Sequence, residues 1–483
     1  MTHFATLPAP DLPAYDRSRL TPGIVHIGLG NFHRAHMAVY LDDLMAMGEA
    51  QDWAILGAGV RAGDARMRDA LMAQDCLSTV IELDPKGKRA RRVGAMIGFI
   101  EVQADNAALI AAMTRPEIRI VSLTVTEGGY FIDAATGQFD TTAADIVHDA
   151  AHPATPMTAF GAILAALRAR RDAGTPAFTV MSCDNLPGNG HVTKAAVVGL
   201  ARMSDPAFAD WVARHVAFPN GMVDRITPAT GPHERALAES FGLQDPVPVT
   251  CEPFRQWVVE DTFPAGRPAW EKVGVTFTPH VHAYEAMKIR ILNGGHAVIA
   301  YPGGLLDIEF VHEAMAHPLI TGLLNKVEAE EIIPYVAPVP DTNLVDYYAT
   351  IRERFSNPEV ADTERRLCLD GFNRQPKFIV PSLRDALAAN GPIDGLALVS
   401  AMWCRYCAGT SDSGTVIAPN DPNWDQLQAL SKAARTNPAL WLGLSAVYGD
   451  LNQNARLVER FSHWLNSLWT QGTAATLKAY IAG

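Results

Sequence analysis

The stretch Gly23-Ile24-Val25-His26-Ile27-Gly28-Leu29-Gly30-Asn31-Phe32-His33 decides the fold. Its first five residues form an apolar run typical of a buried strand, and a helical pattern follows from about residue 33 to 47. A second apolar run covers residues 53–60. Strand, helix and strand within about 40 residues is the spacing of a βαβ unit, so this segment predicts the start of an α/β domain.

The same alternation continues along the first half of the chain, with strands predicted at 118–125 and 178–182 and an amphipathic helix at 158–173. It predicts a Rossmann-like, doubly wound and mostly parallel sheet. Residues 77–83 and 92–102 flank the turn sequence Asp84-Pro85-Lys86-Gly87, which predicts an antiparallel hairpin inserted into this pattern.

From about residue 284 the strand pattern fades and helical segments with short loops take over. We therefore expect a dinucleotide-binding domain with extensions at 1–283 and a mainly α-helical substrate domain at 284–483. A ligand is expected where the helical domain faces the carboxyl ends of the sheet strands.

Composition excludes several classes of protein. The chain has 483 residues, of which 48% are hydrophobic and 19% charged, so it is not disordered. A formal net charge of −12 argues against a nucleic-acid partner. The sequence shows neither a run long enough to span a membrane nor a secretion signal, and its six cysteines are too sparse for a disulfide framework. We expect a cytoplasmic protein without a membrane partner.

The first strand runs directly into a candidate pyrophosphate-binding turn. Gly28 and Gly30 permit a tight turn and close backbone approach, and the helix that starts near Phe32 offers its N-terminal amides to an anion. Asn31 and Arg34 belong to the same candidate cofactor site. His33 occupies the place of the third glycine of the usual motif, and a plain tight turn is the alternative interpretation.

An acid near the end of the second strand usually binds the adenosine ribose of NAD. Asp64 is the available carboxylate, and it favours NAD by repelling a 2′-phosphate, whereas Arg61 is able to accept that phosphate. The alternative is an exposed loop aspartate without a ligand.

The candidate chemical site lies on the predicted helix that starts near residue 284. Glu285, Lys288 and His296 fall within an arc of about 80° at about 100° per residue, and Asn293 lies further round. Gly294 and the next glycine are able to loosen the helix and change the aim of Asn293. From the pattern alone, a surface lysine with an unrelated histidine remains an alternative.

The spacing Lys-x₄-Asn-x₂-His at 288–296 resembles the catalytic signature of the polyol-specific long-chain dehydrogenases. The segments at 28–36, 124–130, 182–186 and 219–228 resemble the same family and occur in its order, so the resemblance covers nearly the whole chain. Within the family, the chain is most similar to bacterial members that act on mannitol.

The resemblance implies reversible oxidation of D-mannitol at C2 to D-fructose, with hydride transfer to NAD and without a metal. Lys288 is then the general base, which burial and nearby cations would bring from a pKa of about 10.4 toward the working pH. Asn185 and Asn293 donate hydrogen bonds to the developing oxyanion, and His296 contacts the same oxygen or a neighbouring hydroxyl. Because Asn185 and Lys288 belong to different predicted domains, the site is expected to straddle their boundary.

The resemblance also assigns roles around this centre with less detail. Val223 lies near the nicotinamide, and the residues assigned to substrate binding or gating are Glu127, Asp224, Glu285, Arg366 and Arg374, with Lys377 competing for one of these places. The resemblance favours a monomeric protein. The expected partner is a small polyol or ketose.

Three alternatives stay open. A sugar-acid oxidoreductase of the fructuronate or altronate type would fix the substrate carboxylate with Arg366, Arg374 or Lys377. D-Arabinitol or D-sorbitol is a further candidate substrate, and a non-catalytic NAD(H) sensor would need no proton-abstracting set. Metal chemistry is not expected, because neither Cys404-Arg405-Tyr406-Cys407 nor the pair His280 and His282 has the further ligands of a zinc site.

Overall fold

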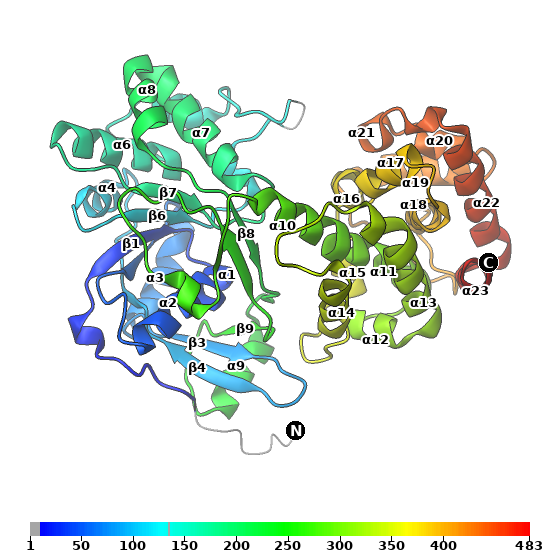
Figure 1. Ribbon diagram of the computed structural model, residues 1–483, viewed down its shortest axis with the longest axis horizontal. Helices are drawn as coiled ribbons and strands as arrows, with labels where there is room; N and C mark the ends of the chain where they lie inside the picture. Colours follow the sequence, from blue (N-terminus) through cyan, green and yellow to red (C-terminus); the bar gives the residue numbers. More distant parts are fainter. Residues whose placement is uncertain (1–9, 134–135) are drawn as a thin grey trace. The chain divides into compact units, whose positions relative to one another are not determined.

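Five parallel strands form the central sheet of the computed structural model, which describes residues 10–133 and 136–483 (Figure 1). The strands are β1 Pro22–Ile27, β2 Ala54–Ala58, β5 Met96–Phe99, β6 Ile120–Leu123 and β7 Thr179–Ser182. Their order is β5-β2-β1-β6-β7, and every neighbouring pair is parallel. This order places β1 at the centre of a Rossmann-type sheet and confirms the predicted fold class.

The two faces of this sheet bury two separate cores, because successive side chains of a strand point to opposite sides. Ile24 packs with α2 (Met37–Ala46), whereas Val25 packs with α6 (Ala159–Asp172). The remaining helices and 3₁₀ turns of residues 10–282 are η1 Arg17–Arg19, α1 Asn31–Ala35, η2 Ala62–Asp64, α3 Ala65–Met72, α4 Ala107–Thr114, η3 Glu127–Tyr130, α5 Ala144–Ala151, α7 Asn189–Ser204, α8 Pro206–His215, α9 Pro232–Ser240 and η4 Trp270–Val273.

The predicted hairpin is present but shorter than expected. Strand β3 (Ser78–Glu82) pairs antiparallel with β4 (Arg89–Val93), and β9 (Val249–Cys251) adds a parallel strand on the other side of β3. The expectation of one strand over 92–102 was wrong. The chain bends at Gly94, where a Cβ would lie 2.8 Å from the Pro13 side chain, and it then enters the central sheet as β5.

A third sheet is formed by strands from the last part of the first unit, between residues 221 and 277. It has the order β11-β10-β8, with β8 Gly221–Asp224, β10 Gln256–Val259 and β11 Thr276–Phe277. Val223 pairs with Trp257 and Asp224 with Gln256 across the antiparallel β8–β10 pair.

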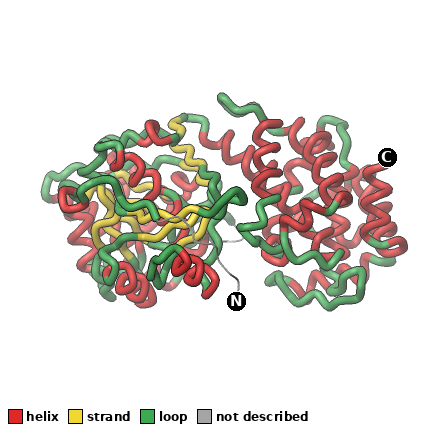
Figure 2. The backbone as a smooth tube through the Cα atoms, turned by 90° about the horizontal axis from the view of Figure 1, so that it is seen from below, coloured by secondary structure: helices red, strands yellow, loops and turns green. Residues whose placement is uncertain are grey.

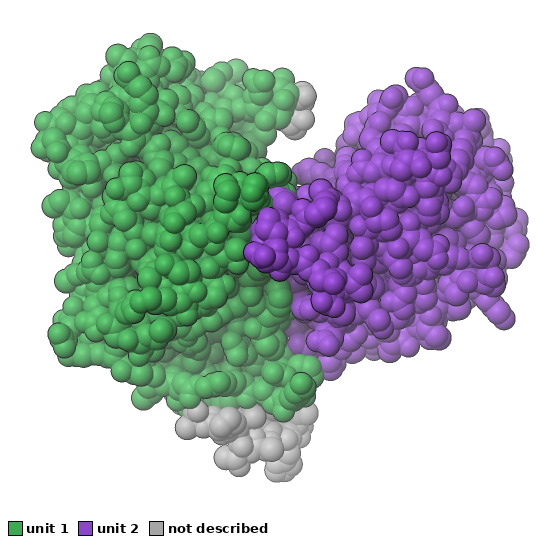
Figure 3. All heavy atoms as spheres, viewed as in Figure 1, with its two compact units in different colours: residues 1–282 green, residues 283–483 purple. Residues whose placement is uncertain are grey.

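The chain divides into two compact units, 1–282 and 283–483, which are coloured separately in Figure 3. All named strands precede residue 278, and the second unit is built from helices and loops (Figure 2). Its helices, with the one that leads into it, are α10 Val281–Met287, η5 Lys288–Asn293, α11 Gly294–Leu305, α12 Val311–Ala316, α13 Pro318–Val327, η6 Glu328–Ile332, η7 Ile333–Tyr335, α14 Leu344–Phe355, α15 Glu364–Leu367, α16 Gly371–Phe378, α17 Val380–Ala388, α18 Asp394–Tyr406, α19 Trp424–Ala434, α20 Ala439–Leu442, α21 Ser445–Tyr448, η8 Leu451–Gln453, α22 Ala455–Gln471 and α23 Thr473–Ala482.

Within the described part of the chain, no helix combines the length and the apolar character that a bilayer-spanning segment requires.

Candidate active site

The predicted site residues of the first unit gather at one edge of the parallel sheet. Gly28 follows β1, Asp64 follows β2, Glu127 follows β6 and Asn185 follows β7. The carboxyl ends of parallel strands meet at this edge, which is where open α/β sheets bind their ligands.

The turn after β1 has the shape that a pyrophosphate needs. Gly28 has φ +90°, and a Cβ at this position would lie 2.2 Å from the carbonyl oxygen of Thr124, so the turn packs directly on the end of β6. At Gly30 a Cβ would meet nothing closer than 3.9 Å. The backbone at Gly30 is therefore open to a ligand at the point where α1 begins, which fits the close approach of a dinucleotide phosphate.

The polar side chains of α1 contact protein groups. The Asn31 amide donates to the carbonyl of Pro228 at 3.1 Å and to the Thr230 hydroxyl at 2.9 Å. Arg34, which is buried, donates to Asn31 Oδ1 at 2.8 Å and to the carbonyl of Val247. These contacts hold the loops around residues 230 and 247 against the turn, so both side chains shape the candidate cofactor site.

Aromatic rings fill the space behind the glycine turn. His33, at the position of the missing third glycine, is buried and stacks on His26 with ring centroids 3.4 Å apart. Burial lowers the pKa of His33 well below its usual value and that of His26 to about 3. Phe32 stacks on His36 at 4.8 Å. The turn therefore rests on uncharged rings.

Asp64 closes the turn after β2. Its Oδ2 accepts hydrogen bonds from the backbone amides of Val60 at 3.0 Å and Arg61 at 2.9 Å, and its side chain is half-buried. The carboxylate thus has a fixed place beyond β2, where a ribose-binding acid is expected.

A single carboxylate connects the loops that follow β6 and β7. Asp184 accepts hydrogen bonds from the backbone amides of Val125 at 2.9 Å and Thr126 at 3.0 Å, and from the Tyr130 hydroxyl at 2.6 Å. Asn185, the next residue, is exposed. Asp184 therefore fixes the start of the loop that carries Asn185.

Thr126 has a strained backbone at this junction. Its φ of 66° and ψ of 165° lie in a region that a β-branched residue rarely adopts, at a typical cost of about 1–3 kcal/mol. The hydrogen bond from its amide to Asp184 holds this conformation, and Glu127 follows as an exposed residue of η3.

Asn189 extends the same network to the third sheet. Its amide donates to the carbonyls of Asp184 at 3.1 Å and Gly221 at 2.8 Å, and its Oδ1 accepts from the Gly221 amide at 2.9 Å. Strand β8, which carries Val223 and Asp224, is thereby tied to the loop of Asn185.

Two of the three predicted catalytic residues of the second unit, Lys288 and Asn293, lie on a π-helix. Lys288 begins the six-residue π-helix η5 and Asn293 ends it, while His296 lies in the first turn of α11. In an α-helix, Asn293 would lie about 140° round from Lys288 at about 100° per residue. In a π-helix, residues five apart are joined by hydrogen bonds, so Asn293 lies about one turn beyond Lys288.

The π-helix therefore changes the direction of Asn293, an effect that was predicted for Gly294 and the next glycine. It brings Asn293 toward the side of Lys288, and His296, three residues beyond Asn293, continues this face in α11. The Lys288 side chain is buried with 6% exposure, and Glu285 and Asn293 are half-buried. His296 stacks on Phe355 with ring centroids 4.0 Å apart. Mid-helix π-turns of this kind are frequent at functional sites.

Arg366 is paired with an acid. Its Nε donates to Asp362 Oδ1 at 2.5 Å, and Nη2 bonds to the other carboxylate oxygen. Burial raises the pKa of Asp362, but the Arg366 guanidinium and the nearby His296 outweigh that effect and hold the pKa below its usual value. Arg374 donates to the backbone carbonyls of Arg366 at 3.2 Å and Leu367 at 3.1 Å.

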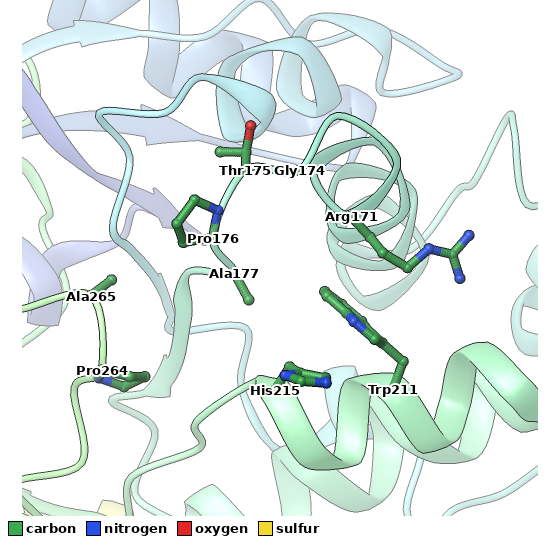
Figure 4. Close-up of a pocket in the computed structure, with 9 residues that line it drawn as sticks. All are labelled: Arg171, Gly174, Thr175, Pro176, Ala177, Trp211, His215, Pro264 and Ala265. Carbon is green, nitrogen blue, oxygen red and sulfur yellow. The ribbon is translucent and has the colours of Figure 1, made fainter.

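The pocket of about 410 Å³ shown in Figure 4 lies elsewhere. Trp211 and His215 of α8, Arg171 of α6 and residues 174–177 line it together with Pro264 and Ala265. Residues 174–177 precede β7, whereas Asn185 follows it, so this pocket lies at the opposite edge of the sheet from the candidate site. None of the predicted site residues lines it.

Among the residues described, no group of three or more His, Cys, Asp or Glu is arranged to hold a metal ion. Cys404 and Cys407 are buried in and just after α18, where burial raises the pKa of both thiols.

The sequence patterns did not identify Asp184 and Asp362 as residues that bind groups of the candidate site. Asp184 directly precedes Asn185, and Asp362 stands four residues before Arg366, a spacing typical of an ion pair. Both signals were in the sequence, but only the structure shows which groups the two carboxylates bind.

The Rossmann sheet and the lysine-bearing helix are typical of a dinucleotide-dependent oxidoreductase, and comparison with known proteins agrees with this class. Residues 22–272 match the mannitol dehydrogenase Rossmann domain, and residues 280–469 match the mannitol dehydrogenase C-terminal domain. The chain belongs to the mannitol dehydrogenase family, which confirms the predicted family and the predicted class of oxidoreductase.

Individual relatives are similar to this chain over nearly its full length. Mannitol 2-dehydrogenase of Cereibacter sphaeroides is 72% identical over 470 residues, which cover 97% of this chain and 98% of that protein. A ternary complex of Pseudomonas fluorescens mannitol 2-dehydrogenase with NAD and D-mannitol is 43% identical, with a TM-score of 0.86 over 98% of this chain and 97% of that one. A substrate-free D-sorbitol dehydrogenase is 36% identical, with a TM-score of 0.92 over 98% of both chains.

Proposed function

We propose that this chain oxidises D-mannitol at C2 to D-fructose with NAD as the hydride acceptor, and that it catalyses the reverse reduction. The relatives named for this activity support the proposal, one of them at 72% identity over nearly the full length and another with NAD and D-mannitol bound. The observation that carries it is the π-helix, which begins at the buried Lys288 and ends at Asn293, three residues before His296.

Lys288 is the general base in this proposal. Hydride departs from a secondary alcohol only if its hydroxyl proton is taken up, and an amine shielded from water is able to accept that proton near neutral pH. The 6% exposure of Lys288 supports this role. Proton exchange with solvent is assigned to Glu285, which lies three residues earlier on α10 and is half-buried.

Asn293 and Asn185 stabilise the substrate oxygen as it gains negative charge. A carboxamide donor of this kind lowers the barrier by about 3–4 kcal/mol. His296 donates to the same oxygen or to an adjacent hydroxyl, and its stacking on Phe355 fixes its ring plane. Proton transfer and oxyanion stabilisation are thus both assigned to side chains, without a metal.

The first unit fits the cofactor. The open backbone face at Gly30 and the close packing of Gly28 on Thr124 suit a pyrophosphate, and Asp64 suits the adenosine ribose. NAD supplies hydride acceptance at its nicotinamide ring when it is bound. Val223 and Asp224 lie on a strand tied to the Asn185 loop, which supports their assignment to the nicotinamide and substrate region.

The deciding experiment is a substrate panel. Purified protein is incubated with NAD or NADP and with D-mannitol, D-sorbitol, D-arabinitol or D-mannonate, and NADH or NADPH formation is followed by absorbance. The highest kcat/KM is expected for D-mannitol with NAD, with D-fructose as the product. NAD binding without turnover of any compound would instead identify a sensor.

D-Sorbitol is the second candidate substrate, because the structural match to D-sorbitol dehydrogenase covers 98% of both chains. A higher kcat/KM for D-sorbitol than for D-mannitol in the same panel would favour it.

Two further expectations belong to the proposal, namely a monomeric enzyme and a cytoplasmic location. Sedimentation equilibrium of the purified protein tests the first. Cell fractionation with an antibody against the chain tests the second.

A further inference from the structure

Arg366 is held by a carboxylate in the geometry that would otherwise bind a substrate carboxylate. Two nitrogens of its guanidinium bond to the two oxygens of Asp362. The side chain of Asp362 is 11% exposed and that of Arg366 is 49% exposed. The acid is therefore fixed inside the unit, whereas part of the guanidinium remains accessible.

The two neighbouring cations are also engaged. Arg374 donates to two backbone carbonyls, those of Arg366 and Leu367. Asp370 directly precedes α16, the helix of both cations, and its carbonyl accepts from the Arg374 amide at 3.1 Å. Burial raises the pKa of Asp370, and the charges of Arg374 and Lys377 oppose this shift. Each cation that was a candidate for binding a sugar acid thus has a carboxylate of the protein in its surroundings.

The Asp362–Arg366 pair belongs to the region of His296. His296 is among the groups that lower the pKa of Asp362. Helix α15, which carries Arg366, packs on α11, which carries His296: a Cβ at Gly303 of α11 would lie 2.7 Å from the Glu364 carboxyl of α15. The ion pair is therefore part of the structure that surrounds the predicted substrate-binding residues of this unit.

We propose that Asp362 is a specificity-determining residue that makes this site select neutral polyols over sugar acids by occupying the guanidinium of Arg366. The inference rests on the proposed polyol oxidation and adds a reason for its choice of substrate class.

The physical basis is the difference between a hydroxyl and a carboxylate. A bidentate arginine–carboxylate pair has its two parallel donors already used, and a second carboxylate at the same place would be repelled by the first. A polyol hydroxyl carries no charge, and it is able both to accept from a remaining guanidinium N–H and to donate to a carboxylate oxygen. The intact pair therefore suits a neutral chain of hydroxyls.

D-Mannonate is the appropriate probe, because it differs from D-mannitol only in having a carboxylate at one end. We would measure kcat/KM for D-mannonate and for D-mannitol, both with NAD, and compare their ratio between enzymes. The test variant is Asp362→Asn, which keeps the size of the side chain and removes its charge. The matched control is Asp450→Asn, which makes the same change of net charge in the exposed Arg384–Asp450 pair of the same unit.

The ratio of D-mannonate to D-mannitol is expected to rise at least tenfold in Asp362→Asn and to stay within twofold of wild type in Asp450→Asn. The double variant Asp362→Asn/Arg366→Gln should lose this gain, because the freed cation is then absent. An unchanged ratio in Asp362→Asn, or a gain that survives removal of Arg366, overturns the proposal.

A second measurement needs no variant and covers the case in which Asp362→Asn fails to fold. In the wild-type enzyme, D-mannonate should inhibit D-mannitol oxidation at least tenfold more weakly than the neutral D-arabinitol does. Equal or stronger inhibition by D-mannonate overturns the proposal. Wild-type turnover of D-mannitol is scored separately, so its absence would refute the proposed function and not the effect of Asp362.

Discussion

The Tyr130 hydroxyl donates a 2.6 Å hydrogen bond to Oδ2 of Asp184 and so joins the segment after β6 to the segment after β7. Asp184 also accepts from the amides of Val125 and Thr126, and the next residue along the chain is Asn185. Burial raises the pKa of Asp184, and these hydrogen bonds to its charged form oppose the shift. We therefore expect the alignment of Asn185, the proposed oxyanion donor, to depend on this carboxylate.

Replacing this carboxylate should slow the reaction more than it weakens binding. In Asp184→Asn one acceptor oxygen becomes a donor, so the three groups that now converge on the carboxylate are no longer all satisfied. We expect kcat for D-mannitol to fall by about 10- to 10³-fold, with a smaller change in KM. The upper limit is the effect of losing one oxyanion donor completely. Steady-state kinetics measures both.

Asp205→Asn is the matched control for this variant. Asp205 also accepts from a backbone amide, that of Phe208, but it caps α8 away from the sheet edge. Its kcat should stay near wild type. Equal losses in the two variants would mean that Asp184 acts only through general stability.

The choice between NAD and NADP should depend on Asp64. Its carboxylate is fixed beyond β2 by the Val60 and Arg61 amides, and a negative charge there favours free ribose hydroxyls over a 2′-phosphate. Asp64→Asn should raise KM for NAD and lower the NAD preference by about tenfold. Asp69→Asn, which removes an exposed acid of α3, should leave the preference unchanged. Parallel losses for both cofactors would show that Asp64 does not contact the ribose.

Glu328 should make the stability of the enzyme depend on pH. Its carboxyl is fully buried, neither oxygen has a hydrogen-bond partner among the described residues, and burial raises its pKa well above the usual 4.5. The folded state therefore holds this proton more tightly than the unfolded state. The contribution of Glu328 to the free energy of unfolding is lost as pH rises above about 4.5 toward the folded pKa.

Glu328→Gln removes this titration and keeps the shape of the side chain. Its free energy of unfolding relative to wild type should increase as pH is raised from about 5 to 8, by about 1.4 kcal/mol for each unit of pKa shift that the substitution abolishes, and its Tm relative to wild type should rise with it. Glu459→Gln, an exposed substitution on α22, should follow the wild-type curve. Thermal melts across this pH range decide, and parallel curves for Glu328→Gln and wild type would contradict the account.

Local patterns predicted the architecture well, because they follow from the periodicity of strands and helices. The buried runs at β1, β2, β6 and β7 form the parallel sheet, and the turn at 84–87 makes the hairpin. The break between β4 and β5 at Gly94 was missed, because Gly94 packs closely against Pro13, a residue far away in the sequence.

Long-range packing determines other features that local sequence patterns do not reveal. The acidic run Glu328-Ala329-Glu330-Glu331 looks like a solvent-exposed helix face, yet Glu328 and Glu331 are buried. Glu331 accepts from the amides of Gly395 and Leu396 at the start of α18, contacts that no local pattern reveals. The π-helix that begins at Lys288 likewise breaks the regular spacing from which its side-chain directions were predicted.

The most direct test of the account is the turnover of Lys288→Ala, measured together with its affinity for NADH. A general base contributes about 10²- to 10⁴-fold to a rate, so kcat for D-mannitol should fall by that factor while the Kd for NADH stays within twofold of wild type. Lys326→Ala is the matched control, because that amine contacts the carbonyl of Tyr480 at 3.1 Å and the Tyr480 ring, and it should keep wild-type turnover. A Lys288→Ala enzyme that oxidises D-mannitol within a few-fold of the wild-type rate would remove the lysine from the mechanism.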